Sequence, residues 1–380
     1  MIKILTVLGA RPQFIKASAL SRAIRNHYQD KIEEIIIHSG QHYDDEMSDV
    51  FFREMEIPLP KINLATGSGL HGRQTGIMLE KMEEIILDLK PNAVLVYGDT
   101  NTTLAAALAA SKLHIPILHV EAGLRSRDKK IPEEINRLIT DHLSTLLFCP
   151  TQTAIENLAN EGFNSNANSP YTSNNPGVFH CGDVMYDNTL FFAEKIRRQE
   201  IFAINITGKN VSYFLGTIHR SVNTDNPERL TGILESLIQI SLNYKIPVIL
   251  PLHPRTKQVL QSMPKLMTEI ELSGNIYIIP PVSFLQMFNL ELHAEMIFTD
   301  SGGVQKEAYF LHKPCVIVND ETPWDELIES GNCIMGGTEP NTIIPAMEKL
   351  YHKKEFSYPE IFGDGHGAEF ICKTIVNTFS

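Results

Sequence analysis

Short runs of uninterrupted apolar residues alternate along this chain with longer segments of helical period. Within 76–89, for example, Met78, Met82 and Leu89 fall on one face of a helix, and 102–113 is rich in alanine. Strands that are apolar on both faces are typical of parallel sheets covered by helices on both sides. The apolar runs lie at 2–8, 34–38, 93–97, 116–120 and 145–149, and again at 212–217, 247–252, 276–280, 295–299 and 314–318. The sequence therefore predicts an α/β protein with two Rossmann-like, doubly wound parallel-sheet domains.

The expected domain boundary follows a segment rich in Asn, Ser and Pro. Residues 164–176 carry no apolar period and predict a surface loop. We expect a first domain over 1–190 and a second over 191–366, with the amphipathic stretch 367–380 a candidate to cross back onto the first. In doubly wound sheets the ligand binds at the carboxyl ends of the strands, so we expect it between the two domains.

Charge and composition exclude several classes of function. Thirty-three Lys and Arg against 45 Asp and Glu give a net charge of −12, which argues against a nucleic-acid partner. No stretch approaches the ~18–20 apolar residues of a membrane span, and the first apolar run is too short for a signal peptide. The five cysteines are scattered without paired spacing. We expect a cytoplasmic protein with reduced core cysteines and no metal site.

Charged residues gather where the predicted strands of the first half end. Arg11 and Lys16 follow the first strand near the start of a helix, which suits an anion, although an ordinary strand–helix turn explains them equally well. Asp99, Glu121 and Glu133 fall at one edge of the same sheet. Crowded carboxylates raise one another's pKa and can divide into an acid and a base. For Glu133 alone, stabilisation of a helix amino terminus is the simpler interpretation.

Polar residues gather in the same way in the second half. His219 with Arg220, and His253 with Arg255, each follow a strand. A single histidine there is more often structural, but two followed closely by arginine favour a function. A third strand runs into a turn of small residues that opens a helix, so backbone N–H groups could receive a phosphate there and an acid on that helix could accept from ribose hydroxyls. These residues are Ser301, Gly302, Gly303 and Glu307.

These strand-end segments, in this order, resemble the non-hydrolysing UDP-N-acetylglucosamine 2-epimerase family over essentially the whole chain. A single tetrapeptide would be weak support, but several motifs in register are specific. They are Gly9-Ala10-Arg11-Pro12, Ser39-Gly40-Gln41-His42, Gly98-Asp99-Thr100, the segments 119–125 and 132–137, His219-Arg220, and the segment 299–307.

The resemblance implies a fold like that of the GT-B glycosyltransferases, a homodimer, and a UDP-sugar held between the domains. The family inverts C2 of the sugar without an external redox cofactor, by eliminating UDP to a 2-acetamidoglycal and re-adding it. Such enzymes serve surface polysaccharides such as the lipopolysaccharide O-antigen. By match of position, the proton transfers and leaving-group assistance would fall to Asp99, Glu121, Glu133 and His219. UDP would be held by Arg11, Lys16, Ser301, Gly302, Gly303 and Glu307.

Two further inferences rest on the same resemblance. Gln41, Arg73, Arg220 and His253 match a second UDP-sugar site through which bacterial members are activated, but Asp44 stands where a glutamine is usual. A surface cation at a helix start explains Arg73 equally well.

Departures from the commoner pattern indicate a branch of the family and with it a substrate. Asn319 and Trp324 replace two arginines of the family, as in the branch that epimerises UDP-2,3-diacetamido-2,3-dideoxy-glucuronate. Losing two cations does not explain a uronate substrate, so this preference rests on resemblance alone. Three alternatives remain open on the sequence: a hydrolysing 2-epimerase, a glycosyltransferase of the same fold, and a UDP-sugar sensor.

Overall fold

The computed structural model of the protein describes residues 1–41, 49–198, 212–252 and 254–380. The chain divides into two compact units. Unit 1 comprises Met1–Asn188 and Glu360–Ser380, and unit 2 comprises Thr189–Pro359. The helix α7 (Val184–Arg198) carries the chain from the first unit into the second.

Unit 1 is built on a seven-stranded parallel sheet with strand order β3-β2-β1-β4-β5-β6-β7. Its strands are β1 (Ile2–Leu8), β2 (Ile32–His38), β3 (Ile62–Asn63), β4 (Ala93–Tyr97), β5 (Ile117–Val120), β6 (Leu146–Cys149) and β7 (Gly177–His180). The central strands are buried because helices cover both faces, which explains their continuous apolar sequence. The order reverses beside β1, so the carboxyl ends of β1 and β4 open at the position where such sheets bind ligands.

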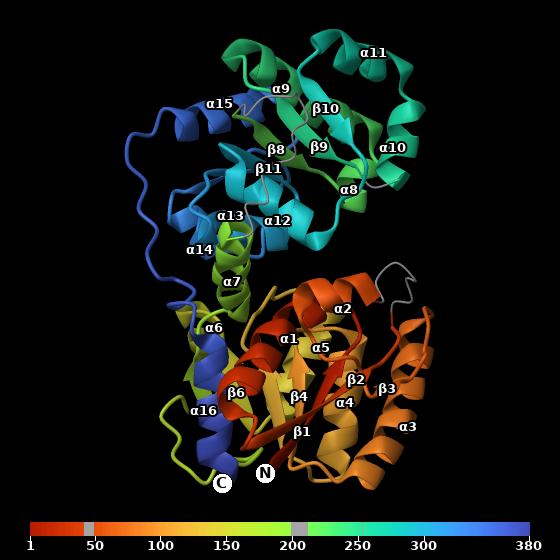
Figure 1. Cartoon of the computed structure of the whole chain (residues 1–380), viewed down its shortest axis with the longest axis vertical. Coiled ribbons are helices and arrows are strands. Elements are labelled where there is room, and N and C mark those ends of the chain that lie inside the picture. The colour runs from red at the N-terminus through yellow and green to blue at the C-terminus, as the bar shows by residue number, and fades with distance from the viewer. Residues whose placement is uncertain (42–48, 199–211, 253) are drawn as a thin grey trace. The chain divides into compact units, whose positions relative to one another are not determined.

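Helices of unit 1 cover the sheet on both faces (Figure 1). They are α1 (Arg11–Ala23), a π-helical turn η1 (Ile24–Tyr28), α2 (Asp49–Met55), α3 (His71–Leu89), α4 (Asn101–Lys112), α5 (Pro132–Leu143), α6 (Gln152–Asn160) and α16 (Gly367–Phe379). The alanines of α4 pack with Met82 and Ile86 of α3 against β1 and β4. Small side chains let α4 approach the sheet closely, which explains the alanine-rich sequence. The last helix, α16, belongs to unit 1 and packs on α1.

Unit 2 is built on a six-stranded parallel sheet with strand order β10-β9-β8-β11-β12-β13. Its strands are β8 (Phe214–Thr217), β9 (Val248–Pro251), β10 (Ile276–Ile279), β11 (Met296–Thr299), β12 (Cys315–Ile317) and β13 (Cys333–Met335). Its helices are α8 (Ser221–Thr224), α9 (Pro227–Tyr244), α10 (Pro254–Gln261), α11 (Pro264–Ser273), α12 (Phe284–His293), α13 (Gly302–Phe310), α14 (Asp325–Glu329) and α15 (Pro340–Tyr351). One apolar core joins the sheet to α9, α11 and α15, with Phe214 and Phe298 edge to face at its centre.

The predicted fold class is confirmed, since both sheets are parallel throughout and covered by helices. Three strands, β3, β7 and β13, lie outside the ten apolar runs of the sequence. β13 has only three residues and β3 only two, both too short to give an apolar run. The five cysteines are buried and free, as predicted. In the part of the chain that the structure describes, no helix is both long and apolar enough to span a bilayer.

Candidate active site

Glu121 and Lys16 meet at the carboxyl edge of the sheet of unit 1, over Gly98. The Lys16 ammonium forms an ion pair with Glu121 Oε2. Gly98 has φ of +61°, and a Cβ there would lie 3.1 Å from Glu121 Oε2 and 3.6 Å from Lys16 Nζ. Glycine is therefore needed both for the turn and for the space that the pair occupies. Glu121 itself adopts φ of +72°, a strained conformation for a side chain of its kind, and such strain concentrates at functional sites.

Asp99 directly follows Gly98 in the sequence, and two residues of α5 contact it. Its carboxylate pairs with Arg137, and its backbone carbonyl accepts a hydrogen bond of 2.8 Å from Asn136 Nδ2. Burial alone would lower the pKa of Arg137, but the negative charges of Asp99, Glu134 and Glu121 raise it. Asp99 therefore contacts the Arg137 guanidinium directly, and the charge of Glu121 acts on the same group. Arg137 was missed as a site residue, although it closes the 132–137 motif.

The third predicted acid, Glu133, is exposed on the first turn of α5. Within the described part of the chain it shares no hydrogen bond or ion pair with Asp99 or Glu121. Its neighbour Glu134 is 2 % exposed and accepts from the Ser126 and Arg127 amides at 2.9 and 3.0 Å. Burial alone would raise the pKa of Glu134, but hydrogen bonds from Ser126, Arg127 and Arg137 lower it. Glu134 thus ties the loop before α5 to the helix.

The turn after β1 is organised from within by Gln13. Its side-chain oxygen accepts from the Gly9 and Ala10 amides at 2.8 and 3.0 Å, and its nitrogen donates to the Tyr97 carbonyl at 2.8 Å. These two amides are therefore already satisfied, so an anion at this turn would depend on the side chain of Arg11. That residue is exposed as the first residue of α1.

In unit 2 the buried carboxylate of Asp300 organises the loop that follows β8. It accepts from the His219 and Arg220 amides at 3.0–3.2 Å and from Asn223 Nδ2 at 3.0 Å. His219 Nδ1 lies 3.3 Å from Asp300 Oδ1, while the His219 side chain is 54 % exposed. Asp300 thus holds the backbone of His219 in place, while the imidazole of His219 is exposed to solvent.

The Ser301–Gly303 turn leads directly from β11 into α13. Ser301 Oγ caps the helix by accepting from the Val304 amide at 3.5 Å. A Cβ on Gly303 would meet nothing closer than Ser301 Oγ at 3.8 Å, so the first turn of α13 is accessible. The Arg220 guanidinium would lie 3.9 Å from a Cβ on Gly302. An open helix amino terminus beside an arginine suits a phosphate group.

Comparisons with known proteins identify the family of this chain. The sequence model of the family described as UDP-N-acetylglucosamine 2-epimerase matches residues 23–376. A UDP-N-acetylglucosamine 2-epimerase homolog of Methanococcus maripaludis is 49% identical over 99% of this chain and all of that protein. UDP-2,3-diacetamido-2,3-dideoxy-D-glucuronate 2-epimerase of Pseudomonas aeruginosa is 45% identical over 98% of this chain and all of that protein. The chain belongs to the UDP-N-acetylglucosamine 2-epimerase family.

A solved structure of a relative has the same fold as this chain. The crystal structure of Methanocaldococcus jannaschii UDP-GlcNAc 2-epimerase, in complex with UDP-GlcNAc and UDP, superposes with a TM-score of 0.83 at 41% identity. The match covers 99% of this epimerase and all of that chain. The GT-B-like fold and the non-hydrolysing family, both expected from the motifs, are confirmed.

The segment of this epimerase that departs most from the commoner family pattern lies against the turn of unit 2. The Trp324 indole is 5 % exposed and donates from Nε1 to the Gly302 carbonyl at 3.1 Å. Lys306 Nζ lies 4.1 Å from the centre of the indole ring. Asn319 instead accepts from Arg229 at 3.3 Å. An aromatic ring with a buried ammonium therefore packs beneath the turn, where the sequence motif alone gave no expectation of one.

The residues that match the second, activating site are only partly described in this epimerase. Gln41 Oε1 accepts from Thr102 Oγ1 at 2.7 Å and is nearly buried, so it joins the loop after β2 to the start of α4. Arg73 is exposed on the first turn of α3, as either interpretation predicts. His253 and Asp44 lie outside the described residues.

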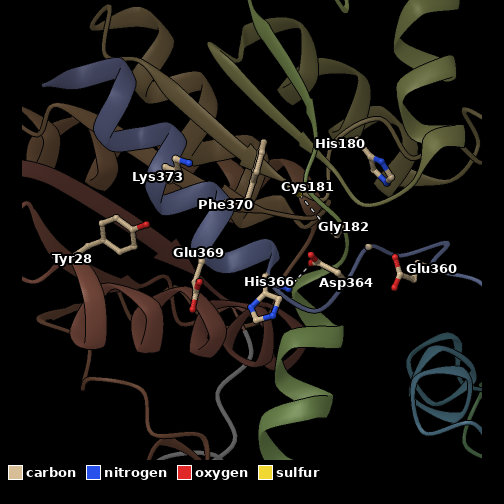
Figure 2. Close-up of a pocket in the computed structure, with 11 residues that line it drawn as sticks. Tyr28, His180, Cys181, Gly182, Glu360, Asp364, His366, Glu369, Phe370 and Lys373 are labelled. Atoms are coloured by element: carbon tan, nitrogen blue, oxygen red, sulfur yellow. Dashed lines mark hydrogen bonds between the residues drawn. The ribbon is translucent and has the colours of Figure 1, made fainter.

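A separate surface cavity of about 540 Å³ lies in unit 1, between the end of β7 and the start of α16 (Figure 2). His180 and Glu360 lie on one side of the view, and Tyr28 and Lys373 on the other. It contains no predicted site residue. Over the described ranges, no group of three or more His, Cys, Asp or Glu side chains is arranged to hold a metal ion.

Proposed function

We propose that this chain inverts C2 of a UDP-linked 2-acetamido sugar by eliminating and re-adding UDP, as a non-hydrolysing UDP-sugar 2-epimerase. The observation that carries the proposal is the convergence of Asp99 and Glu121 on Arg137 at the carboxyl edge of the sheet of unit 1. Each of these carboxylates forms an ion pair, Asp99 with Arg137 and Glu121 with Lys16.

The reaction needs a base on one face of C2 and an acid on the other. One carboxylate removes the C2 proton while the C1–O bond to the diphosphate breaks with its electron pair, so UDP leaves and a C1=C2 double bond forms. UDP then re-adds to C1 through a phosphate oxygen as a proton reaches the opposite face of C2. Asp99, Glu121, Glu133 and His219 are the proposed proton carriers.

UDP is the proposed ligand of the Ser301–Gly303 turn, with Glu307 on the ribose and Arg11 and Lys16 on the phosphates. Amides at a helix amino terminus stabilise the diphosphate as a leaving group. Since Lys16 pairs with Glu121, its contact with a phosphate would require exchange of partners. The assignment of acid–base residues to 1–190 and of UDP binding to 191–366, the homodimer and the role in surface polysaccharides stay predictions.

Two UDP-sugars are candidate substrates. UDP-GlcNAc is named for the Methanocaldococcus relative and the diacetamido uronate for the Pseudomonas relative, at similar identity to this chain. The preference for the second branch rests on the resemblance at Asn319 and Trp324 alone. The deuterium-exchange experiment described next decides between the two sugars.

Proton exchange with solvent tests the proposal directly. The purified full chain is incubated in D₂O with UDP-GlcNAc or with the diacetamido uronate, and the products are identified by NMR. We expect deuterium at C2 and the C2 epimer with one of them, and no label with Glu121→Gln. Absence of label with both sugars would overturn the proposal. Free UDP in amounts equal to product would indicate hydrolysis instead, and turnover only with an added acceptor would indicate a glycosyltransferase.

A further inference from the structure

A chain of alternating charges lies beneath the carboxyl edge of the sheet of unit 1. His119 of β5 and Asp141 of α5 are both fully buried, with Nδ1 and Oδ1 2.6 Å apart. Asp141 Oδ2 accepts from Arg125 at 2.7 Å and from the Gly123 amide at 3.2 Å. Arg125 makes a bidentate contact with Glu161 at 2.6 and 2.7 Å. None of these residues belongs to the proposed set of proton carriers or UDP ligands.

The hydrogen bonds of His119 fix its chemical form. Nε2 lies 2.8 Å from the Gly98 carbonyl, which can only accept, so Nε2 donates. Nδ1 faces Asp141. Burial alone would raise the pKa of Asp141, but the charges of His119 and Arg125 and their hydrogen bonds lower it. Because Asp141 also pairs with Arg125, it faces the ring as a carboxylate, so Nδ1 also donates, and a ring with two donors is an imidazolium.

The carbonyl that His119 holds belongs to the turn between Asp99 and the end of β4. The amide of Gly98 donates to the Val120 carbonyl at 3.0 Å, so residues of β5 bind both the N–H and the C=O of Gly98. Asp141 also anchors the next turn through Gly123, whose φ is +79° and where a Cβ would lie 2.4 Å from the Ala154 carbonyl. Glu121 lies between these two anchors.

We propose that His119 is a positioning residue, an imidazolium that donates from both ring nitrogens, to Asp141 and to the Gly98 carbonyl, and so sets the separation of the Asp99 and Glu121 turns. The role of these turns rests on the proposed function, whereas the charge state of His119 does not. The charged groups connected to the ring are Asp141 from α5, Arg125 from the loop between β5 and α5, and Glu161 after α6. Among these three, Asp141 is the one that contacts the ring itself.

Histidine NMR tests the charge state without any substrate. The full chain, labelled with ¹⁵N-histidine, is recorded between pH 6 and 9, and His119 is assigned by the signal that His119→Gln removes. We expect both ring nitrogens to show the closely spaced shifts of an imidazolium. The widely separated shifts of a neutral ring at pH 8 would overturn the proposal, whether or not the protein proves to be an epimerase.

Asp141→Asn tests the positioning. An amide has one acceptor oxygen for donors from His119, Arg125 and Gly123, so the turns lose their common anchor. With the sugar that is turned over, we expect kcat to fall about 10²-fold while KM changes less than about threefold, because a displaced catalytic group costs rate and no UDP contact is altered.

The matched control is Leu158→Ala, which opens a buried site in the neighbouring core of α6 and also lowers stability. We expect it to keep kcat within about twofold of the unaltered protein where both are folded. An equal loss of kcat in Leu158→Ala and Asp141→Asn, at equal folded fraction by circular dichroism, would contradict the positioning role.

Discussion

Asp300 connects the loop of His219 to the phosphate turn through a single side chain. The carboxylate holds two consecutive backbone N–H groups and lies beside the imidazole, and it directly precedes Ser301. Because Asp300 is fully buried, an amide in its place leaves donors without an acceptor. The orientation of His219 should therefore depend on this carboxylate.

A double-mutant cycle measures that dependence. We expect Asp300→Asn to lower the free energy of unfolding by about 1–3 kcal/mol and to lower kcat by about 10²-fold. His219→Asn should lower kcat by ~10²–10⁴-fold, as for other lost acid–base groups. If Asp300 acts through His219, the kcat of the double variant should lie within about twofold of the kcat of His219→Asn alone. Fully additive losses in steady-state kinetics would contradict the coupling.

Single residues show where sequence reasoning reaches its limit. Strand-end position alone made Asp99, Glu121 and His219 candidates, because a parallel sheet brings its carboxyl ends together. The partner of each was not predictable. Lys16 contacts a residue 105 positions away, and Arg137 one 38 positions away, and only the three-dimensional turns determine such pairs. The choice between Glu133 and Glu134 depends on a helical rotation of one residue.

Among the elements, α16 is anchored to unit 1 by a carboxylate of α7. Asp187 accepts from the Gly367 and Ala368 amides at 3.2 and 2.8 Å, so it occupies the amino terminus of α16. Burial raises the pKa of Asp187 to about 6 from 3.8, in spite of these hydrogen bonds. The folded protein therefore binds this proton more tightly than the unfolded chain does.

The sign of the resulting pH dependence follows from that difference. Stability from this group is fully present below about pH 4 and is lost as pH rises through about 6, by up to about 3 kcal/mol at ~1.4 kcal/mol per pKa unit. We expect Asp187→Asn to remove this slope when urea unfolding is compared at intervals from pH 4.5 to 7.5. Asp88→Asn, at an exposed position of α3, is the control and should leave the slope unchanged. An unaltered slope in Asp187→Asn would assign it to another group.

The elements themselves were largely readable from the sequence. The buried strands and the long amphipathic helices each carry enough apolar residues to establish a period, as in α3 and α9. β13 and the short helix α8 do not, since their position is set by neighbouring strands and by Asp300. β2 begins two residues before its predicted start, because Ile32 and Glu33 also pair with β1, opposite Ile2 and Lys3.

At the scale of the whole molecule, the two units have separate cores and one of them holds the only tryptophan of the sequence. Trp324 touches the turn proposed to bind UDP, so its emission reports on unit 2 alone. We expect UDP at about 100 times its Kd to stabilise the transition seen by Trp324 by ~2.7 kcal/mol. Uridine, which lacks the diphosphate, should shift it much less. Suppose that UDP does not shift the unfolding transition followed by Trp324 fluorescence but does stabilise the transition followed by circular dichroism. The nucleotide would then bind to unit 1.

The discontinuity of unit 1 has a consequence for how the protein is made. Residues 1–188 leave the ribosome first, but the strip from 360 to 380 that completes this unit emerges only after all of unit 2. Until then the surface of α1 that α16 covers stays uncovered on the nascent chain. Unit 2, continuous in sequence, can mature during translation, whereas the half that carries Asp99 and Glu121 must wait for the final helix.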